Sequence, residues 1–208
     1  MPTITFYRAN RACPSPHTPD GVESADGSIT RAAYLSIHPS GFVPALDVDG
    51  EIITELPAVL NYIVSLAPPS AAAGTLLGAD DLGRARVAEW LAWLSGSLHG
   101  QGFGMLWRAG RFTDDEGAHE GVRTKGREFI DGCFRRIEER LRGREFAVGE
   151  GLTVVDFNLY VFWTWGIEIG VQMAELYPSY ADLMRRVESI EAVRTVVKTE
   201  GLKLTATA

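Results

Sequence analysis

Two side chains stand out as candidates for chemistry, a cysteine near the start of the chain and a histidine near its middle. Cys13 lies in the stretch ACPSPH, directly after a short run of strand-forming residues. A thiol near a cation or a helix N-terminus has a lowered pKa and becomes a good nucleophile. Ser15 is an alternative hydrogen-bond donor to a thiolate at this place. The other interpretation of Cys13 is a small packed side chain, which the sequence alone does not exclude.

His99 lies in the stretch WLAWLSGSLHGQGFGMLWR. A neutral imidazole is a competent base or hydrogen-bond donor near pH 7. The alternative is a histidine whose ring is satisfied in an interface between helices. The neighbouring Gly100, Gly102 and Gly104 interrupt helical regularity, which favours a functional role. These glycines follow no predicted strand, so a dinucleotide-binding loop is excluded.

The stretch 41–63 is predicted to be a compact framework of two strands and a helix. The strands are predicted over 45–48 and 51–53, and Asp49-Gly50 between them is a strong signal for a two-residue hairpin turn. The helix that follows carries apolar residues at helical spacing. We therefore expect an antiparallel hairpin that leads directly into a helix.

The two ends of this framework offer backbone groups to a ligand. Pro44 cannot donate a hydrogen bond to a sheet, so the backbone of Val43 is left to pair with another molecule. Thr54 and Glu55 can cap and charge the start of the helix, and Pro57 is tolerated in its first turn. A strand edge beside a helix N-terminus is suited to an extended anionic peptide.

The bulk properties are those of an ordinary globular protein. The 208 residues are 46% apolar and 23% charged, which is enough for one large domain or two small ones. A net charge of -7 without a basic face argues against nucleic acid as a partner. Cys13 and Cys133 suggest no disulfide framework, and no segment reads as a signal peptide or a membrane span. We expect a cytoplasmic protein, and no residue spacing predicts a metal site.

The remaining stretches are predicted from the positions of proline and glycine and from the spacing of apolar residues. Residues 3–7 are predicted to form the first strand, whereas prolines over 8–30 argue against a full helix there. A short helical turn is expected over 32–37, ending at His38-Pro39. The Pro- and Ala-rich segment 66–78 is predicted to be a linker. After it, the pattern is helical only.

The helical half has a clear centre. Residues 152–165 are apolar nearly all round, which predicts a buried helix. Thr153 and Asp156 stand at the N-cap and N3 positions of a capping box, and Leu152 can pack on Phe157 as a hydrophobic staple. Further helices are predicted from the apolar spacing, with one starting at Pro178 and another in SIEAVRTVVKTEGL. Two more are predicted from apolar faces at Val87, Trp90, Leu91, Leu94 and Leu98, and at Phe129, Ile130, Cys133, Phe134, Ile137 and Leu141.

These motifs resemble those of the glutathione transferases over nearly the whole chain. Val-Pro before a hairpin, followed by Thr-Glu at a helix start, looks like the family's glutathione-binding half. The stretch around Cys13 is similar to the Ala-Cys-Ser-x-x-Pro-His stretch of the beta (bacterial-type) class. The stretch from His99 to the Leu-Trp-Arg triplet is similar to that class as well, with one residue inserted here.

The resemblance implies an α/β plus all-α architecture. A truncated thioredoxin-like N-terminal domain (1–65) would bind glutathione, and an all-α substrate domain (79–208) would follow the linker. The family is usually homodimeric, so a homodimer is expected. Residues 8–30 look shortened, as if the family's first helix and second strand were reduced or replaced by a loop.

The family's glutathione contacts fall on the framework described above. The resemblance implies a cis bond before Pro44, a backbone pairing between Val43 and the cysteinyl part of glutathione, and contacts of Glu55 and Leu56 with the γ-glutamyl end. Leu56 departs from the family, which usually has Ser or another small residue there. His38 can contact the glycyl carboxylate, and the alternative is that it only ends a turn.

The resemblance also implies an active site and a pocket. Cys13 would lie beside the glutathione sulfur, where it could form a mixed disulfide, and His99 would lie nearby. Other classes use a tyrosine hydroxyl near the end of the first strand, so Tyr7 is a third candidate there. Its alternative role is packing within the sheet. Phe103 and Trp107, with Met105, would line an apolar pocket for the second substrate, or else belong to the core.

The function expected from this resemblance is a glutathione-dependent transferase that acts on a hydrophobic electrophilic small molecule. The reaction would be conjugation, or reversible thiol addition that isomerises a conjugated cis–trans olefin, as in fungal transferase-like isomerases of polyketide pathways, a branch of secondary metabolism. Two alternatives stay open. One is glutathione-dependent thiol–disulfide exchange through Cys13, and the other is a non-catalytic scaffold of the same fold.

Overall fold

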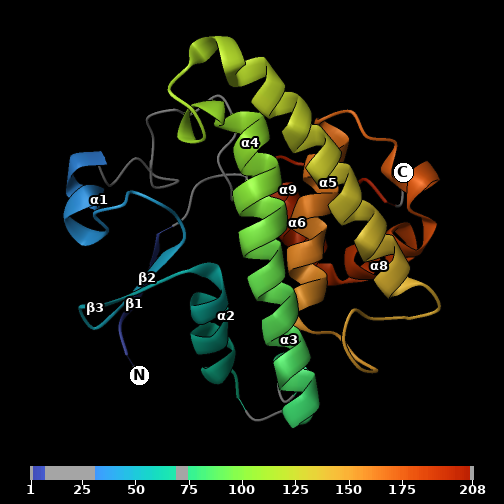
Figure 1. Cartoon of the computed structure of the whole chain (residues 1–208). Helices are drawn as coiled ribbons and strands as arrows, with labels where there is room; N and C mark the ends of the chain where they lie inside the picture. The colour runs from blue at the N-terminus through green and yellow to red at the C-terminus, as the bar shows by residue number, and fades with distance from the viewer. Residues whose placement is uncertain (1, 8–30, 69–74, 207–208) are drawn as a thin grey trace. The chain divides into compact units, whose positions relative to one another are not determined.

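The chain divides into two compact units, Met1–Pro68 and Pro69–Ala208 (Figure 1). The computed structural model describes residues 2–7, 31–68 and 75–206. The boundary between the units falls within the segment that we expect to be a linker. Across the described residues, no helix is long and apolar enough to span a membrane.

The first unit contains a three-stranded sheet in the order β1-β2-β3, with antiparallel pairing throughout. The strands are β1 (Ile4–Tyr7), β2 (Ala45–Val48) and β3 (Glu51–Thr54). The predicted hairpin is confirmed, because β2 and β3 are joined by Asp49 and Gly50, both with positive φ, as a type I′ turn requires. The Asp47 carboxylate accepts a hydrogen bond from the Gly50 amide at 2.8 Å and stabilises the turn.

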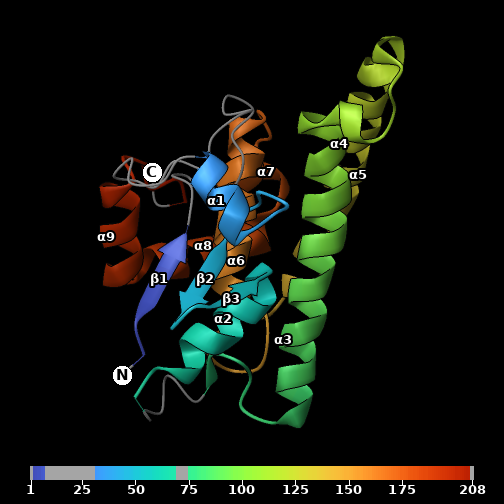
Figure 2. The ribbon, with the colours of Figure 1, turned by 90° about the vertical axis from the view of Figure 1, so that its left-hand side faces the viewer.

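Two helices accompany this sheet, α1 (Arg31–Ile37) and α2 (Leu56–Ser65) (Figure 2). Tyr34 of α1 is fully buried and packs with Ala45 and Tyr7, which are paired across β1 and β2. Because side chains alternate along a strand, Leu46 is directed to the opposite face, and it is buried as well. The α2 helix packs against β2 and β3. Both helices lie close to the predicted places.

Every regular element among the described residues of the second unit is a helix. Its elements are α3 (Asp81–Trp93), η2 (Leu94–Phe103), α4 (Gly104–Trp107), η3 (Ala109–Arg111), η4 (Glu116–Ala118), α5 (His119–Leu141), α6 (Val154–Glu168), α7 (Met173–Leu176), α8 (Pro178–Ser189) and α9 (Glu191–Thr199). The predicted apolar faces of α3 and α5 are buried, apart from the half-buried Phe129. The fold class expected from the sequence is therefore confirmed, a small α/β part followed by an all-α part.

The segments α3, η2 and α4 form one continuous helical rod beside α5 (Figure 1). Its middle part, η2, is a π-helix, in which the Gly104 amide donates to the carbonyl of His99 five residues earlier. The rod approaches α5 closely through two glycines. A Cβ atom on Gly102 would lie 2.9 Å from the Ile130 side chain, and one on Gly126 would lie 2.8 Å from the Leu106 amide. Close helix packing therefore explains part of the glycine-rich motif.

The α6 helix packs against α3 and α8, and its start confirms the predicted capping box. One carboxylate oxygen of Asp156 accepts hydrogen bonds from the amide and the hydroxyl of Thr153, at 2.7 and 3.0 Å. The other oxygen accepts a hydrogen bond from the Ala147 amide at 2.8 Å. Asp156 is fully buried. Burial raises the pKa of Asp156, and these hydrogen bonds oppose that shift.

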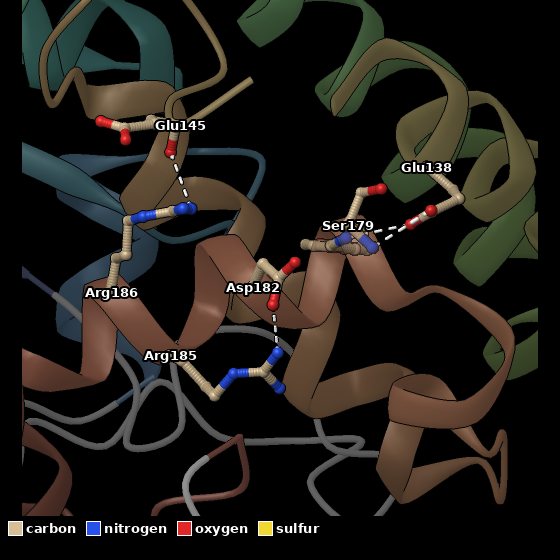
Figure 3. A network of polar contacts seen from close by, with 7 residues as sticks. Glu138, Glu145, Ser179, Asp182, Arg185 and Arg186 are labelled. Carbon is tan, nitrogen blue, oxygen red and sulfur yellow. Dashed lines mark hydrogen bonds and ion pairs between the residues drawn. The ribbon is translucent and has the colours of Figure 1, made fainter. Parts of the chain in front are cut away.

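The start of α8 is held by a side chain from another helix (Figure 3). The Glu138 carboxylate of α5 accepts hydrogen bonds from the amides of Ser179 and Tyr180, at 3.1 and 2.9 Å. Pro178 occupies the first turn, as predicted. Further along α8, Arg186 donates to the carbonyl of Glu145 at 3.3 Å. These contacts join α8 to α5 and to the segment before α6.

A buried carboxylate holds the last described residues. Glu188 of α8 is 1% exposed and accepts hydrogen bonds from the Tyr160 hydroxyl at 2.9 Å and from the Thr205 amide at 2.6 Å. The Ala206 amide also donates to it, at 3.1 Å. The indole of Trp163 donates to the Thr205 hydroxyl at 3.1 Å. The segment after α9 is therefore tied to α6 and α8.

Candidate functional site

In the first unit, a tyrosine of α1 positions the segment that leads into β2. The Tyr34 hydroxyl donates a hydrogen bond of 2.5 Å to the carbonyl of Phe42. The next peptide bond, between Val43 and Pro44, is cis, as the resemblance implies. The turn between α1 and this segment is closed by a hydrogen bond of 2.8 Å from the Gly41 amide to the His38 carbonyl.

The start of α2 is open. Glu55 stands at the N-cap position with φ 69 and ψ 120, a backbone conformation that residues other than glycine rarely adopt. Its side chain makes no capping hydrogen bond, so the expectation that Glu55 caps the helix is wrong. The backbone conformation of Glu55 is also not the extended one that is usual at an N-cap, and its side chain is exposed. Amides of the first turn, such as that of Leu56, are thus left to interact with solvent or with an anion.

The other predicted residues of this unit lie around Tyr34. The rings of Tyr7 and His38 lie 5.6 and 6.1 Å from the Tyr34 ring, measured between centroids. Tyr7 therefore packs within the sheet region, which was its alternative role. Burial, with a contribution from Tyr7, raises the pKa of Tyr34 to about 12, so its hydroxyl stays protonated. The sequence analysis missed Tyr34, because a single tyrosine in a short helix gives no signal of its hydrogen bond.

A shallow hollow of about 580 Å³ lies elsewhere in this unit. Its lining comes from β3 and α2, and consists of Ile53, Pro57, Ala58, Asn61, Tyr62 and Ser65. None of the predicted glutathione contacts belongs to it.

Of the two cysteines, the structure describes Cys133. Cys13, like Ser15, lies outside the described residues. Cys133 lies on the buried face of α5 and is 6% exposed. Burial raises the pKa of the Cys133 thiol to about 11, although Arg136 opposes the shift. Cys133 is therefore protonated at neutral pH and has little nucleophilic character.

In the second unit, His99 lies within the π-helix η2, so the predicted break is a change of helix type rather than an end. The His99 ring lies 5.8 Å from the Trp165 ring. Burial is the largest effect on its titration, and the positive charges of Arg108 and Arg111 add to it. Together they lower the pKa of His99 to about 4. The imidazole is therefore neutral at pH 7 and serves as a hydrogen-bonding group, with little capacity to hold a proton.

The aromatic residues near His99 form a cluster rather than a lined pocket. Phe103 is 1% exposed, and its ring lies 4.6 Å from Trp107 and 5.0 Å from Trp165. Phe103 thus belongs to the core, which was its alternative role. Trp107 is half-buried and lies 5.1 Å from Trp165. Within this cluster, Trp107 and His99 are partly exposed to solvent.

Taken separately, the two units offer different chemistry. The first presents backbone donors and a helix start, which suit an anionic peptide. The second presents an imidazole that is neutral at pH 7 and a half-buried indole. Among the described residues, no group of three His, Cys, Asp or Glu side chains is arranged to hold a metal ion.

Comparisons with known proteins identify relatives of this chain. Residues 112–191 match the glutathione S-transferase C-terminal domain family. The chain is 31% identical over 175 residues to glutathione S-transferase GST-4.5 of Xanthomonas campestris, covering 81% of this chain and 80% of that protein. It is 26% identical over 187 residues to maleylacetoacetate isomerase maiA of Aspergillus fumigatus, covering 86% and 78%.

A solved structure gives a similar result in three dimensions. A sphingomonad glutathione S-transferase in complex with glutathione superposes with a TM-score of 0.68 at 31% identity. The match covers 82% of this chain and 80% of that one. The likeness therefore extends over both units and is not confined to the helical part.

Proposed function

Because this chain belongs to the glutathione S-transferase family, we propose that it is an enzyme that binds glutathione and uses its thiol against a hydrophobic electrophile. The likeness to a transferase with bound glutathione supports this proposal. The observation that carries it for this chain is the open start of α2, which directly follows the hairpin of β2 and β3.

Glutathione is an extended peptide with a carboxylate at each end, and the first unit matches these features. The backbone of Val43 pairs with the cysteinyl part of the peptide. The γ-glutamyl end lies at the start of α2, where the Leu56 amide and the helix dipole favour its carboxylate. The Glu55 carboxylate faces the γ-glutamyl ammonium. His38, whose ring lies 6.1 Å from the Tyr34 ring, is the proposed partner of the glycyl carboxylate.

Bound glutathione supplies a thiolate, and the protein's part is to favour and position it. Cys13 and Ser15 are the proposed donors near the sulfur, and His99 is the proposed donor in the second unit. His99 cannot act as a strong base, because its imidazole has a pKa of about 4. In this proposal it acts by donating a hydrogen bond to the second substrate.

Two outcomes of thiol attack are compatible with the family. In conjugation, a carbon–sulfur bond forms, a leaving group departs and glutathione is consumed. In isomerisation of a conjugated olefin, the thiol is returned. The likeness to maleylacetoacetate isomerases, including that of Aspergillus fumigatus, supports isomerisation as a possible reaction of this chain.

Calorimetry with glutathione tests the binding step. We expect saturable binding to the wild-type chain and a loss of about tenfold in affinity for Glu55→Ala. Binding that is absent in the wild type, or unaffected by Glu55→Ala, would contradict the proposal. Thiol titration during turnover of an electrophile then separates the two outcomes, because only conjugation consumes glutathione in proportion to product.

A further inference from the structure

The segment between α1 and β2 is held at three points by hydrogen bonds. The His38 amide donates to the carbonyl of Tyr34 at 2.8 Å, and the Gly41 amide donates to the carbonyl of His38 at 2.8 Å. The third bond comes from a side chain, because the Tyr34 hydroxyl donates to the carbonyl of Phe42 at 2.5 Å. Tyr34 therefore holds both the start and the end of this turn.

Phe42 and Val43 share one peptide unit. Its peptide bond is trans, because the cis bond of this segment is the following one. In a trans peptide the carbonyl and the N–H lie in one plane and point in opposite directions. A hydrogen bond that fixes the Phe42 carbonyl therefore also fixes the Val43 N–H, which points away from the Tyr34 hydroxyl. Among the described residues the Val43 amide has no hydrogen-bond partner, so it is available to a ligand.

The side chain of Tyr34 is enclosed by the core of the first unit. Tyr34 is fully buried, the rings of Tyr7 and His38 lie 5.6 and 6.1 Å from its ring, and Val43 packs against the same core cluster. A buried hydroxyl costs free energy unless it is hydrogen-bonded, and the Phe42 carbonyl satisfies it. Burial raises the pKa of the Tyr34 hydroxyl to about 12, so it remains a donor at neutral pH.

We propose that Tyr34 is a positioning residue of the glutathione site, because its hydroxyl orients the Phe42–Val43 peptide so that the Val43 N–H faces the cysteinyl carbonyl of glutathione. The inference rests on the proposed glutathione-dependent function, and it adds a residue that does not touch the ligand. Tyr34 acts through a main-chain group of the protein on a main-chain group of the bound peptide. All the protein groups involved belong to the first unit.

Calorimetry with Tyr34→Phe tests the effect on affinity. The variant keeps the ring and removes only the hydroxyl that bonds to Phe42, so we expect glutathione to bind about fivefold more weakly. The matched control is Tyr62→Phe, which removes a hydroxyl in the same unit from a residue that lines the hollow between β3 and α2. The control should bind glutathione as the wild type does. Equal affinities of the wild type and Tyr34→Phe would overturn the proposal.

NMR spectra at saturating glutathione separate positioning from a general loss of stability. Saturating ligand keeps the variant folded and bound, so a purely structural effect would leave the bound-state amide shifts unchanged. In the wild type, the Val43 amide proton should move downfield on binding, because it donates a new hydrogen bond. In Tyr34→Phe this shift should be smaller, whereas the shift of the Leu56 amide at the start of α2 should stay the same. A weaker affinity with an unchanged Val43 shift would overturn the positioning role.

Failure of the proposed function gives a different result. If glutathione neither binds the wild-type chain in calorimetry nor moves its Val43 amide resonance, the glutathione-dependent function is wrong, and the role of Tyr34 is overturned with it. If glutathione binds and its affinity falls in Glu55→Ala but not in Tyr34→Phe, the function stands and only the role of Tyr34 is overturned.

Discussion

Two helix starts in this protein differ in whether a side chain caps the first turn. At the start of α6, the buried Thr153 and Asp156 satisfy each other's polar groups and also the amide of Ala147. At the start of α2, Glu55 takes a strained backbone conformation, and its exposed side chain makes no cap. The first helix start is closed by the protein itself, and the second is left open.

The difference shows how stability and binding are separated along the chain. A closed start contributes to the free energy of unfolding, because its buried donors would otherwise be unsatisfied. An open start contributes little to that free energy and keeps amides available for an anion. Backbone strain at Glu55 fits this view, because strained residues cluster at sites that bind ligands. The following predictions test the contrast, beginning with the largest effect.

Replacing Asp156 by alanine should have the largest effect on stability. The change leaves three buried donors without an acceptor and opens a small cavity, so we expect a loss of about 4 kcal/mol in the free energy of unfolding. Urea denaturation measures it. The matched control is Asp81→Ala, in the first turn of α3, where the side chain is 99% exposed and pairs only with Arg84. That variant should lose less than about 0.5 kcal/mol.

Acid should destabilise the chain through a group in the second unit rather than through the open helix start. The folded state keeps His99 neutral down to about pH 4, whereas in the unfolded state it takes up a proton near pH 6.5. Stability therefore falls as pH drops from 6.5 to 4, and is fully present above pH 6.5. We expect His99 to contribute about 3 kcal/mol to this fall. His99→Gln should remove that part of the pH dependence in urea titrations, and an unchanged slope would contradict the assignment.

Replacing Glu55 by glycine should separate binding from stability. Glycine adopts a positive φ without steric strain, so the free energy of unfolding should stay the same or rise by about 1 kcal/mol. The affinity for glutathione should fall at least about tenfold, because the carboxylate is lost. Calorimetry and urea denaturation measure the two quantities. The control Glu51→Ala, at an exposed position of β3, should change neither, and a parallel loss of stability in Glu55→Gly would erase the contrast.

Leu56→Ser should have the smallest effect. A hydroxyl at the first position of α2 adds one donor to the amides already present, so glutathione should bind about threefold more tightly. Stability should change by less than about 0.5 kcal/mol, because Leu56 is only half-buried. A weaker affinity would mean that the leucine itself contacts the ligand.

Local patterns predicted the fold well. Asp49-Gly50 fixed the hairpin, and the Thr153–Asp156 pair fixed the start of α6, because in each case neighbouring residues determine the geometry. Apolar spacing gave the buried faces of α3 and α5 for the same reason. Leu152 and Phe157 remain a predicted staple.

The site was harder to predict, because its parts depend on contacts between distant segments. The hydrogen bond from Tyr34 to Phe42 joins α1 to the loop before β2, and the effect of Arg108 on His99 depends on how the chain turns after α4. Phe103 has the composition of a pocket residue, yet neighbouring helices enclose it on every side. Glu55 was expected to cap α2 and makes no capping hydrogen bond, because no pattern in the sequence signals a positive φ at glutamate.

The π-helix η2 has a consequence for how this chain tolerates insertions and deletions. A helix that gains one residue can widen locally, so the elements on either side keep their places and the change remains confined to a single turn. Removing one residue from 94–103 should reverse this and return the segment to α-helical hydrogen bonding. Because each residue of an α-helix advances by about 100°, the imidazole would then swing around the rod and lose its neighbour Trp165. A single codon in this segment would thus decide whether the imidazole lies against the indole or points elsewhere.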